Sequence, residues 1–175
     1  MSHDAWSLYR PNPVSAARVQ ALANVLTDCV EGGASVSFML PLTRERALAF
    51  WQRVADDVAR GARILIVAAD AQGICGTVQL VLDLPENQPH RADLCKMLVP
   101  RRARRQGLGA ALLAAAEQAA RDAGRTLLVL DAVSGADGAR LYERGGWTRV
   151  GEIPNYALYP AGGLCPTTYY YKDLT

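Results

Sequence analysis

The decisive stretch of this sequence is Arg101-Arg102-Ala103-Arg104-Arg105-Gln106-Gly107-Leu108-Gly109, which is basic and contains two glycines. Before it, residues 92–99 predict a strand that Pro100 ends, and after it, residues 108–123 predict a helix without an internal breaker. The first turn of a helix has unpaired N–H groups and partial positive charge. Glycine also lets the backbone approach a ligand closely. The stretch therefore predicts a phosphate-binding loop, with pyrophosphate as its natural ligand.

Length and composition limit the kind of protein that surrounds this loop. A chain of 175 residues, half of them apolar, predicts one domain over residues 1–175 with a substantial core. The net charge is only +2, so the basic residues at 101–105 indicate a local site and not a nucleic-acid-binding surface. The N-terminus lacks signal-peptide features, and no apolar run approaches the ~18 residues of a membrane span. We expect a cytoplasmic protein.

The four cysteines are expected to be free, small apolar residues. They are far apart and form no C-x-x-C pair, which argues against a metal site and against disulfides. They are Cys29, Cys75, Cys95 and Cys165.

The whole chain predicts the element order β-α-α-β-β-β-α-β-α-β-β. Ser15 and Thr43 are N-cap candidates for the first two helices. The strand at 126–131 follows the helix after strand 92–99, so the two are expected to pair in parallel through a right-handed crossover. The expected strands are 6–10, 64–69, 74–82, 92–99, 126–131, 147–152 and 167–171, and the expected helices are 16–31, 44–60, 108–123 and 137–144. The pattern predicts an α/β (α+β) fold with a mixed sheet.

Two common nucleotide-binding loops do not fit the decisive stretch. A P-loop requires a lysine followed by Ser or Thr directly after its last glycine, and Ala110 begins an alanine pair there. A Rossmann loop is closer, since the two glycines form G-x-G and Asp131 lies where a ribose-binding acid is expected. However, Leu112 replaces the third glycine, and residues 100–106 separate the strand from Gly107, where a Rossmann turn is immediate.

What fits is R-x-x-G-x-G, formed by Arg104, Gly107 and Gly109, after an extended strand and before a helix. This arrangement resembles the acetyl-coenzyme A loop of the GNAT family of N-acetyltransferases. Residues 139–147, Ala-Arg-Leu-Tyr-Glu-Arg-Gly-Gly-Trp, resemble the family's helix-tyrosine-glycine-aromatic signature, and the element order is similar as well. The resemblance implies a GNAT fold of about seven strands and four helices. It also implies direct acetyl transfer from acetyl-CoA to an amine, without a covalent enzyme intermediate.

The resemblance also implies which residues bind acetyl-CoA. The pantetheine arm would lie between the strands at 92–99 and 126–131, which splay apart in the family. Backbone groups of Met97, Leu98 and Val99 would hold the arm and polarise the thioester carbonyl. Either Arg101 or Arg102 is expected to reach the 3′-phosphate. The residues expected at the pyrophosphate are Arg104, Arg105, Gln106, Gly107, Leu108, Gly109 and Ala110.

Acetyl transfer requires a neutral amine and a protonated leaving thiolate. Tyr142 stands at the family's position for the general acid, and the alternative is that its ring only packs in the core. Asp93 and Asp131 are the candidates for the general base, and the alternatives are an exposed strand face and a strand-end cap. Lys96 is also able to pair with one of them. A histidine base would require His90 to fold inward.

The acceptor is expected to be a small-molecule amine. Residues 31–39, 147–154 and 166–172 resemble family members that acetylate an amino-acid-like β-lactam toxin, which implies a role in detoxification or resistance. That likeness assigns Gly33, Ser35 and Phe38 to the acceptor pocket. An amino acid, a polyamine or an aminoglycoside stays open as the acceptor.

The partners of the chain and one of its segments allow more than one interpretation. A catalytically silent module that binds coenzyme A or nucleic acid remains the rival to an enzyme. For the enzyme we expect no nucleic acid, membrane or metal as partner, and either a monomer or a homodimer. The Gly- and Pro-rich loop at 156–165 either covers the site or contacts a second subunit.

Overall fold

The computed structural model of the chain describes residues 6–175, and its elements follow the predicted order. A single 3-10 helix, η1, is added at the start of the decisive loop. The strands are β1 (Ser7–Tyr9), β2 (Arg63–Asp70), β3 (Gly73–Val81), β4 (Arg91–Leu98), β5 (Leu127–Val133), β6 (Thr148–Leu158) and β7 (Leu164–Asp173). The helices are α1 (Ala16–Glu31), α2 (Arg44–Ala59), η1 (Arg101–Ala103), α3 (Leu108–Asp122) and α4 (Asp137–Arg144).

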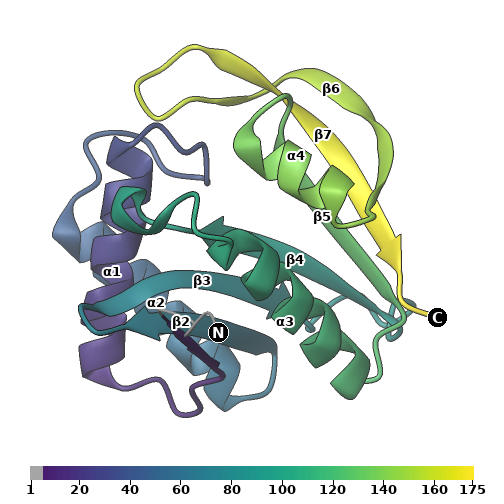
Figure 1. The fold of residues 1–175 in the computed structure, drawn as a ribbon, viewed down its shortest axis with the longest axis horizontal. Coiled ribbons are helices and arrows are strands. Elements are labelled where there is room, and N and C mark those ends of the chain that lie inside the picture. Colours follow the sequence, from purple (N-terminus) through teal and green to yellow (C-terminus); the bar gives the residue numbers. More distant parts are fainter. Residues whose placement is uncertain (1–5) are drawn as a thin grey trace.

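The described strands form one seven-stranded sheet in the order β1-β2-β3-β4-β5-β7-β6. Neighbouring strands are antiparallel, except that β4 and β5 are parallel as the crossover through α3 requires. Helices α1 and α2 pack on one face of the sheet, and α3 and α4 cover the other (Figure 1). The predicted fold class is confirmed.

The helix starts follow from the capping residues that the sequence provides. The hydroxyl of Ser15 accepts a hydrogen bond from the Arg18 backbone N–H at 3.3 Å, and Thr43 does the same for Arg46 at 3.3 Å. By contrast, α3 begins after Gly107 without a side-chain cap. Among residues 6–175, none of the helices is both long and apolar enough to cross a membrane.

Strands β4 and β5 are joined over only part of their length. Their last paired residues are Asp93 and Val129, although β4 continues to Leu98 and β5 to Val133. Figure 1 shows the two strands together near the C-terminus and diverging toward the loop that leads into α3. The splay that the family resemblance implied is therefore present.

A β-bulge interrupts β4 within the splayed part. Gln79 of β3 pairs with Cys95 and Thr77 pairs with Leu98, so Lys96 and Met97 together oppose a single residue of β3. Lys96 has a φ of +51°, in the left-handed region. Because the extra residue reverses the alternation of side chains, Leu98 packs in the core beneath α1 and α2.

The last two strands are longer than predicted. The segment at 156–165, expected to be a loop, belongs to β6 up to Leu158 and to β7 from Leu164. Only residues 159–163 form the turn, which the Tyr159 backbone N–H closes by donating to the Gly163 carbonyl oxygen at 2.9 Å. The pairing is irregular between Ile153 and Ala157, so the hairpin accommodates its prolines without ending. The Gly- and Pro-rich composition therefore marked a turn, not the whole segment.

Candidate active site

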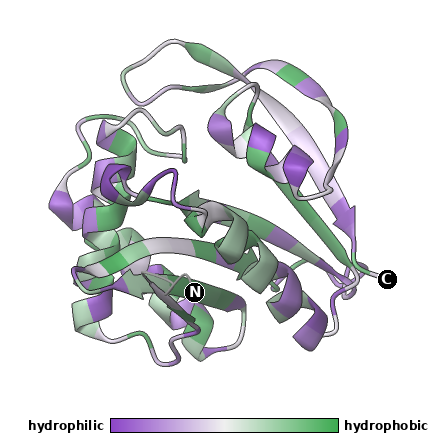
Figure 2. Ribbon diagram, in the orientation of Figure 1, coloured by the Kyte–Doolittle hydropathy of each residue, from purple (hydrophilic) through white to green (hydrophobic). Residues whose placement is uncertain are grey.

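The loop before α3 presents a row of unpaired backbone donors. From Arg105 to Ala110, six consecutive N–H groups have no hydrogen-bond acceptor among residues 6–175. The next N–H, of Ala111, donates to the Gly107 carbonyl oxygen at 3.2 Å and begins the helical ladder. Figure 2 shows the loop that leads into α3 as mainly hydrophilic and the neighbouring strands as mainly apolar. Unpaired donors at the positive end of a helix fit the diphosphate expected there.

The two glycines of the motif have different structural reasons. Gly107 has a φ of +80° and open space where a Cβ would be, so its backbone conformation requires glycine. A Cβ on Gly109 would instead meet the Leu141 side chain at 3.2 Å. Gly109 therefore lets α3 and α4 pack closely, in addition to any ligand contact of its N–H.

Arg101 and Arg102 anchor the loop to the rest of the fold. The Arg101 backbone N–H and guanidinium both donate to the Asp28 carboxylate, at 2.7 and 2.9 Å. The Arg102 guanidinium donates to Asp70 at 2.6 Å and to the Ile74 carbonyl oxygen at 3.2 Å. In this structure both guanidinium groups hold the loop, and their contact with the 3′-phosphate stays a prediction. Their partners are distant in sequence and gave no local signal.

The other two arginines lie nearer to the unpaired donors. Arg104 Nε donates to the Val99 carbonyl oxygen at 3.0 Å and so joins the loop to the end of β4. Arg105 forms a 3.0 Å ion pair with Asp137 in which both side chains are well exposed. An exposed ion pair contributes at most about 1 kcal/mol, so the cost of separating Arg105 from Asp137 is small.

The splayed strands expose backbone edges beside this loop. Beyond Asp93, the edge of β4 that faces β5 has no strand partner, and this edge carries the predicted residues Met97 and Leu98. The Val99 carbonyl oxygen already accepts from Arg104. Unpaired strand edges bind the amide groups of an extended ligand.

Tyr142 of α4 is buried, with only 5% of its surface exposed. Its ring packs against Trp147 and Tyr170 at centroid distances of 5.8 and 6.0 Å. In the described part of the chain, its hydroxyl has no hydrogen-bond partner. Burial raises the pKa of the phenol, and the negative charge of Asp131 raises it further. The ring thus packs as the alternative expected, while the hydroxyl keeps its proton and is free to donate it.

A buried ion pair between Glu117 and Lys172 lies next to Trp147, which packs against Tyr142. The sequence did not predict this ion pair. Lys172 Nζ lies 2.8 Å from the Glu117 carboxylate and donates to the Gly145 carbonyl oxygen at 2.7 Å. Trp147 Nε1 donates to the same carboxylate at 3.0 Å. The available signal was a glutamate at a position of α3 whose helical neighbours Leu113 and Ala120 are core residues.

The two candidate carboxylates share one face of the sheet but have different partners. Their strand neighbours pack beneath α3, so by alternation Asp93 and Asp131 point to the other face. Asp93 forms a salt bridge with Arg91 of its own strand. Asp131 is exposed, and within residues 6–175 its carboxylate accepts only from the Thr167 hydroxyl, at 3.1 Å. The Thr167 oxygen also lies 3.0 Å from the Ala132 carbonyl oxygen, so its single proton is shared between the two acceptors. Asp131 lies within β5, not at the strand end that was expected.

His90 does not fold inward. It is exposed in the β3–β4 connection, and its carbonyl oxygen accepts from the Thr126 backbone N–H at 2.8 Å. That bond places it at the closed end of the β4–β5 pair, away from the splayed end.

The segment between α1 and α2 contacts the β6–β7 hairpin. Ser35 Oγ donates to the Leu158 carbonyl oxygen at 2.8 Å, and the Leu40 N–H donates to Pro160 at 2.9 Å. Phe38 packs edge-on against Phe50 of α2 at 5.3 Å. Gly33, with φ of +89°, forms the turn after α1. The three residues predicted for the acceptor pocket therefore lie in a segment that contacts the hairpin, and each also has a structural role.

The start of α3 presents unpaired backbone N–H groups beside two parallel strands that separate. This arrangement suits a diphosphate joined to an extended arm that contains amide groups, as in coenzyme A. The fold and the site are those of coenzyme A-dependent acyltransferases. Residues 61–149 match the family model described as the acetyltransferase (GNAT) domain. The match covers just over half of the chain, and the chain belongs to this family.

Three solved structures show the same fold at low sequence identity. A candidate acetyltransferase from Salmonella typhimurium, yncA, solved with its cofactor acetyl-CoA, has 17% identity and a TM-score of 0.80, over 98% of this chain and 95% of that one. Ribosomal-protein-alanine N-acetyltransferase from Brucella melitensis has 20% identity and a TM-score of 0.77, over 95% and 99%. A candidate phosphinothricin N-acetyltransferase has 18% identity and a TM-score of 0.77, over 97% and 99%. The protein is thus an acetyl-CoA-dependent N-acetyltransferase.

Proposed function

We propose that the protein transfers the acetyl group directly to the amine of a small molecule, with Tyr142 as general acid and Asp131 as general base. The observation that carries this proposal is that the hydroxyl of the buried Tyr142 has no hydrogen-bond partner among residues 6–175. The negative charge of Asp131 is near enough to raise the pKa of this hydroxyl. Acetyl-CoA supplies the activated acyl group when it is bound. The chain supplies the backbone donors of residues 105–110 and the strand edge of β4 for orientation.

Tyr142 fits the role of proton donor to the departing thiolate. Its pKa is raised by burial and by Asp131, so the phenol stays protonated throughout the neutral range. An acid that remains protonated is available in every turnover without a separate protonation step. No hydrogen bond to residues 6–175 has to break before the proton moves.

Asp131 suits the base better than Asp93. The Arg91 guanidinium lies against Asp93 and holds that carboxylate in an ion pair. Asp131 has only a shared hydroxyl proton, so its oxygens remain able to accept from an ammonium or from an intervening water. We assign proton removal from the acceptor amine to Asp131, while Asp93 stays in its ion pair with Arg91 on the same face.

For the acceptor, we propose an amino-acid-like molecule, and specifically a β-lactam toxin of the kind inactivated by the tabtoxin resistance acetyltransferase. This rests on the resemblance of residues 31–39, 147–154 and 166–172, and on the contacts of Ser35 with the β6–β7 hairpin. Gly33, Ser35 and Phe38 would line that pocket. Among the structural relatives, one is named for ribosomal-protein alanine and another for phosphinothricin, so acceptor choice depends on loops and not on the fold.

The competing nucleic-acid-binding function is disfavoured because two arginines of the basic loop bind to other parts of the fold. Arg101 forms an ion pair with Asp28, and Arg102 forms one with Asp70. Calorimetry separates the two functions, with coenzyme A, acetyl-CoA and duplex DNA as titrants. We expect micromolar-range binding of both coenzymes and none of DNA. Tight, steeply salt-dependent DNA binding without coenzyme binding would contradict the proposal.

Coenzyme A release in the presence of amine panels then tests the acceptor. The panels are amino acids, polyamines, aminoglycosides and tabtoxinine-β-lactam, each at one concentration with acetyl-CoA saturating. We expect the toxin and amino acids to give the highest kcat/KM. A preference for polyamines or aminoglycosides would remove the amino-acid-like acceptor while leaving transfer to an amine in place.

A further inference from the structure

Lys96 is a half-buried ammonium group without a carboxylate partner. No carboxylate of residues 6–175 lies within salt-bridge distance of its Nζ, which donates to Ser37 Oγ at 3.1 Å and lies 6.0 Å from the centroid of the Phe50 ring. Lys172, the only other lysine, is paired with Glu117 at 2.8 Å. A cation withdrawn from water without a counter-ion is unfavourable, which indicates that its counter-ion is a ligand.

The backbone is strained at both ends of the Lys96–Ser37 hydrogen bond. Lys96 has a φ of +51° at the β4 bulge, and Ser37 has a φ of +77° in the α1–α2 connection. Such conformations cost of order 1 kcal/mol or more for residues other than glycine and concentrate at functional sites. Lys96 and Ser37, two strained residues from distant segments, are therefore hydrogen-bonded to each other. This bond fixes the ammonium beside the part of β4 that has separated from β5.

The site contains one positive and one negative side chain, Lys96 and Asp131. Lys96 contacts Ser37 and Phe50 on the face of the sheet that α1 and α2 cover, and Asp131 points to the same face. Burial lowers the pKa of Lys96, and the negative charge of Asp131 opposes that change. Cys95 and Arg63 are the other ionisable groups near enough to act on Lys96. With Asp93 neutralised by Arg91, the remaining pair is one cation and one anion. That pattern complements a molecule that carries both an amine and a carboxylate.

We propose that Lys96 binds the carboxylate of an amino-acid-class acceptor while Asp131 faces its amine, so that Lys96 is a specificity-determining residue. This inference rests on the proposed transfer to a small-molecule amine. One of the three ammonium protons goes to Ser37, and two remain for a carboxylate. A polyamine or an aminoglycoside offers no carboxylate and would meet the ammonium as a repelling charge.

The test compares each L-amino acid with its α-carboxamide as acceptor, using the wild type, Lys96→Met and Lys96→Arg. For amino acids, we expect Lys96→Met to raise KM by about 10- to 100-fold with kcat within about threefold, the range for losing one hydrogen-bonded charge. We expect Lys96→Arg to restore part of the loss. For the carboxamides, Lys96→Met should change neither constant by more than about twofold.

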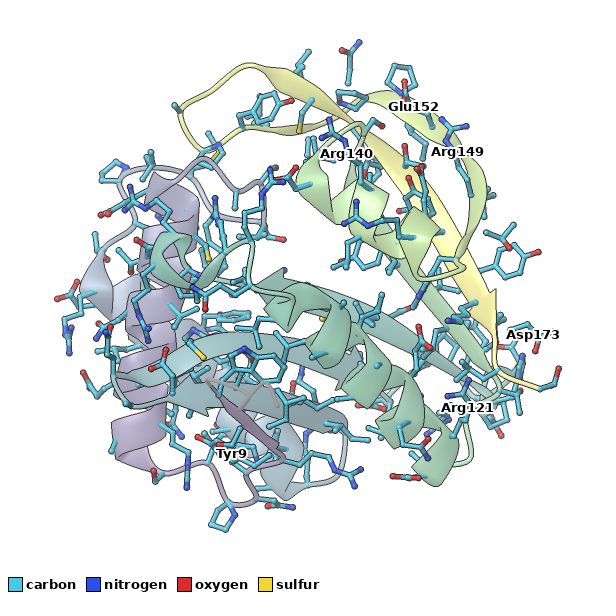
Figure 3. The ribbon with its side chains drawn as sticks, in the orientation of Figure 1. Tyr9, Arg121, Arg140, Arg149, Glu152 and Asp173 are labelled. Carbon is cyan, nitrogen blue, oxygen red and sulfur yellow. The ribbon has the colours of Figure 1, made fainter. Side chains whose placement is uncertain are left out.

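The control variant is Arg149→Met, which removes a positive charge from the outer strand β6. Figure 3 shows Arg149 on the outer rim of the molecule, where it is ion-paired with Glu152 at 3.8 Å. It should leave acid and carboxamide kinetics unchanged. Acetyl-CoA affinity, measured by calorimetry, should be the same in all variants and shows that each has folded.

Two results would overturn the role of Lys96: carboxamides used as well as acids by the wild type, or equal losses for acids and carboxamides in Lys96→Met. Acetylation of spermidine or kanamycin but of no amino acid would also overturn it, and would leave transfer to an amine intact. Bound acetyl-CoA without coenzyme A release for any amine would instead contradict the proposed function itself.

Discussion

At the scale of single residues, Tyr142 differs from the tyrosines near it because its ring is buried while its hydroxyl has no hydrogen-bond partner among residues 6–175. Tyr170, beside it, donates to Glu143 at 3.1 Å, and Tyr169 pairs with Tyr156 at 2.8 Å. The hydrogen bond with Tyr156, then burial and then the charge of Asp131, raises the pKa of Tyr169 to about 12. A phenol that already shares its proton is a poorer acid than one with a free hydroxyl.

Replacing Tyr142 with Phe should lower kcat by about 10²-fold and leave acetyl-CoA affinity unchanged, the order expected for loss of one positioned acid. Because its pKa is raised, Tyr142 stays protonated as pH increases and should cause no loss of activity below about pH 10. Steady-state kinetics across pH and calorimetry check both points. Tyr171→Phe, at an exposed position of β7, is the control. Unchanged turnover in Tyr142→Phe would remove this residue from the mechanism.

Replacing Asp131 with Asn should lower kcat/KM by about 10² or more, whereas Asp93→Asn should lower it by about tenfold or less. The difference arises because Asp93 is held by Arg91, while Asp131 has only a shared hydroxyl proton. Both variants are measured with one acceptor over a range of pH. Equal losses would mean that the two carboxylates act together. A larger loss in Asp93→Asn would reverse the assignment.

The sequence predicted the candidate site residues, but not their hydrogen-bond and ion-pair partners. Tyr142, Asp93 and Asp131 were predicted from the family pattern and from their place on the splayed strands. Which acid is paired depends on Arg91 and Thr167, and the second of these lies on a strand that pairs with β5 only after folding. Lys96 was predictable only as a partner of a carboxylate, because its bulge and its contact with Ser37 involve residues 59 positions apart.

At the scale of elements, two arginines connect the loop before α3 to other elements. Arg101 ties it to α1 and Arg102 ties it to the end of β2. The row of unpaired N–H groups is thereby arranged before the ligand binds, which reduces the ordering cost of binding. Helix starts, helix ends and strand order were predictable from local signals such as Ser15 and Thr43. The length of β6 and β7 was not, because cross-strand pairing outweighed their Gly- and Pro-rich composition.

Replacing Asp28 with Asn should weaken acetyl-CoA binding by about three- to tenfold through loss of the Arg101 anchor. Partial burial raises the pKa of Asp28, but hydrogen bonds and charge from Arg101 outweigh it and bring the pKa below its ordinary value. A lowered pKa stabilises the anchor above about pH 4, and that contribution is lost only as pH falls through the folded value. The weakening should therefore be constant from about pH 5 to 9.

Calorimetry with acetyl-CoA at several pH values checks this expectation. Glu31→Gln is the matched control, since Glu31 lies 3.8 Å from the same guanidinium and is more exposed. Its affinity should stay within about twofold of wild type. Equal affinity of Asp28→Asn and wild type would show that the loop is ordered without this anchor.

At the scale of the whole molecule, the splay divides the fold into two parts. One contains β1–β4 with α1, α2 and α3, and the other contains β5–β7 with α4 (Figure 1). Three β4–β5 residue pairs join them at one end. Elsewhere the two parts are joined by the hydrogen bonds of Ser35 and Leu40 with the β6–β7 hairpin. They are also joined by the packing of α3 on α4, where a Cβ on Gly145 would meet the Leu113 side chain at 2.8 Å. The opening is therefore held by contacts outside the sheet.

The Glu117–Lys172 ion pair is a buried polar contact between the two parts, since it connects α3 with β7. Both side chains are largely buried, and Glu117 also accepts from Trp147, which packs on Tyr142. Replacing Glu117 with Leu leaves the Lys172 ammonium in the core with only a carbonyl oxygen as partner. This should lower the free energy of unfolding by about 3 kcal/mol.

The double variant Glu117→Leu/Lys172→Met should recover most of that stability, because removing both charges also removes their desolvation cost. Urea unfolding of the wild type, the two single variants and the double variant gives the coupling energy between the residues. Turnover should nevertheless stay reduced in the double variant, since Trp147 loses its acceptor and the Tyr142 ring loses a fixed neighbour. Additive losses of stability would show that the two charges act independently. Full activity in a stable double variant would show that the Glu117–Lys172 ion pair is not needed to position Tyr142.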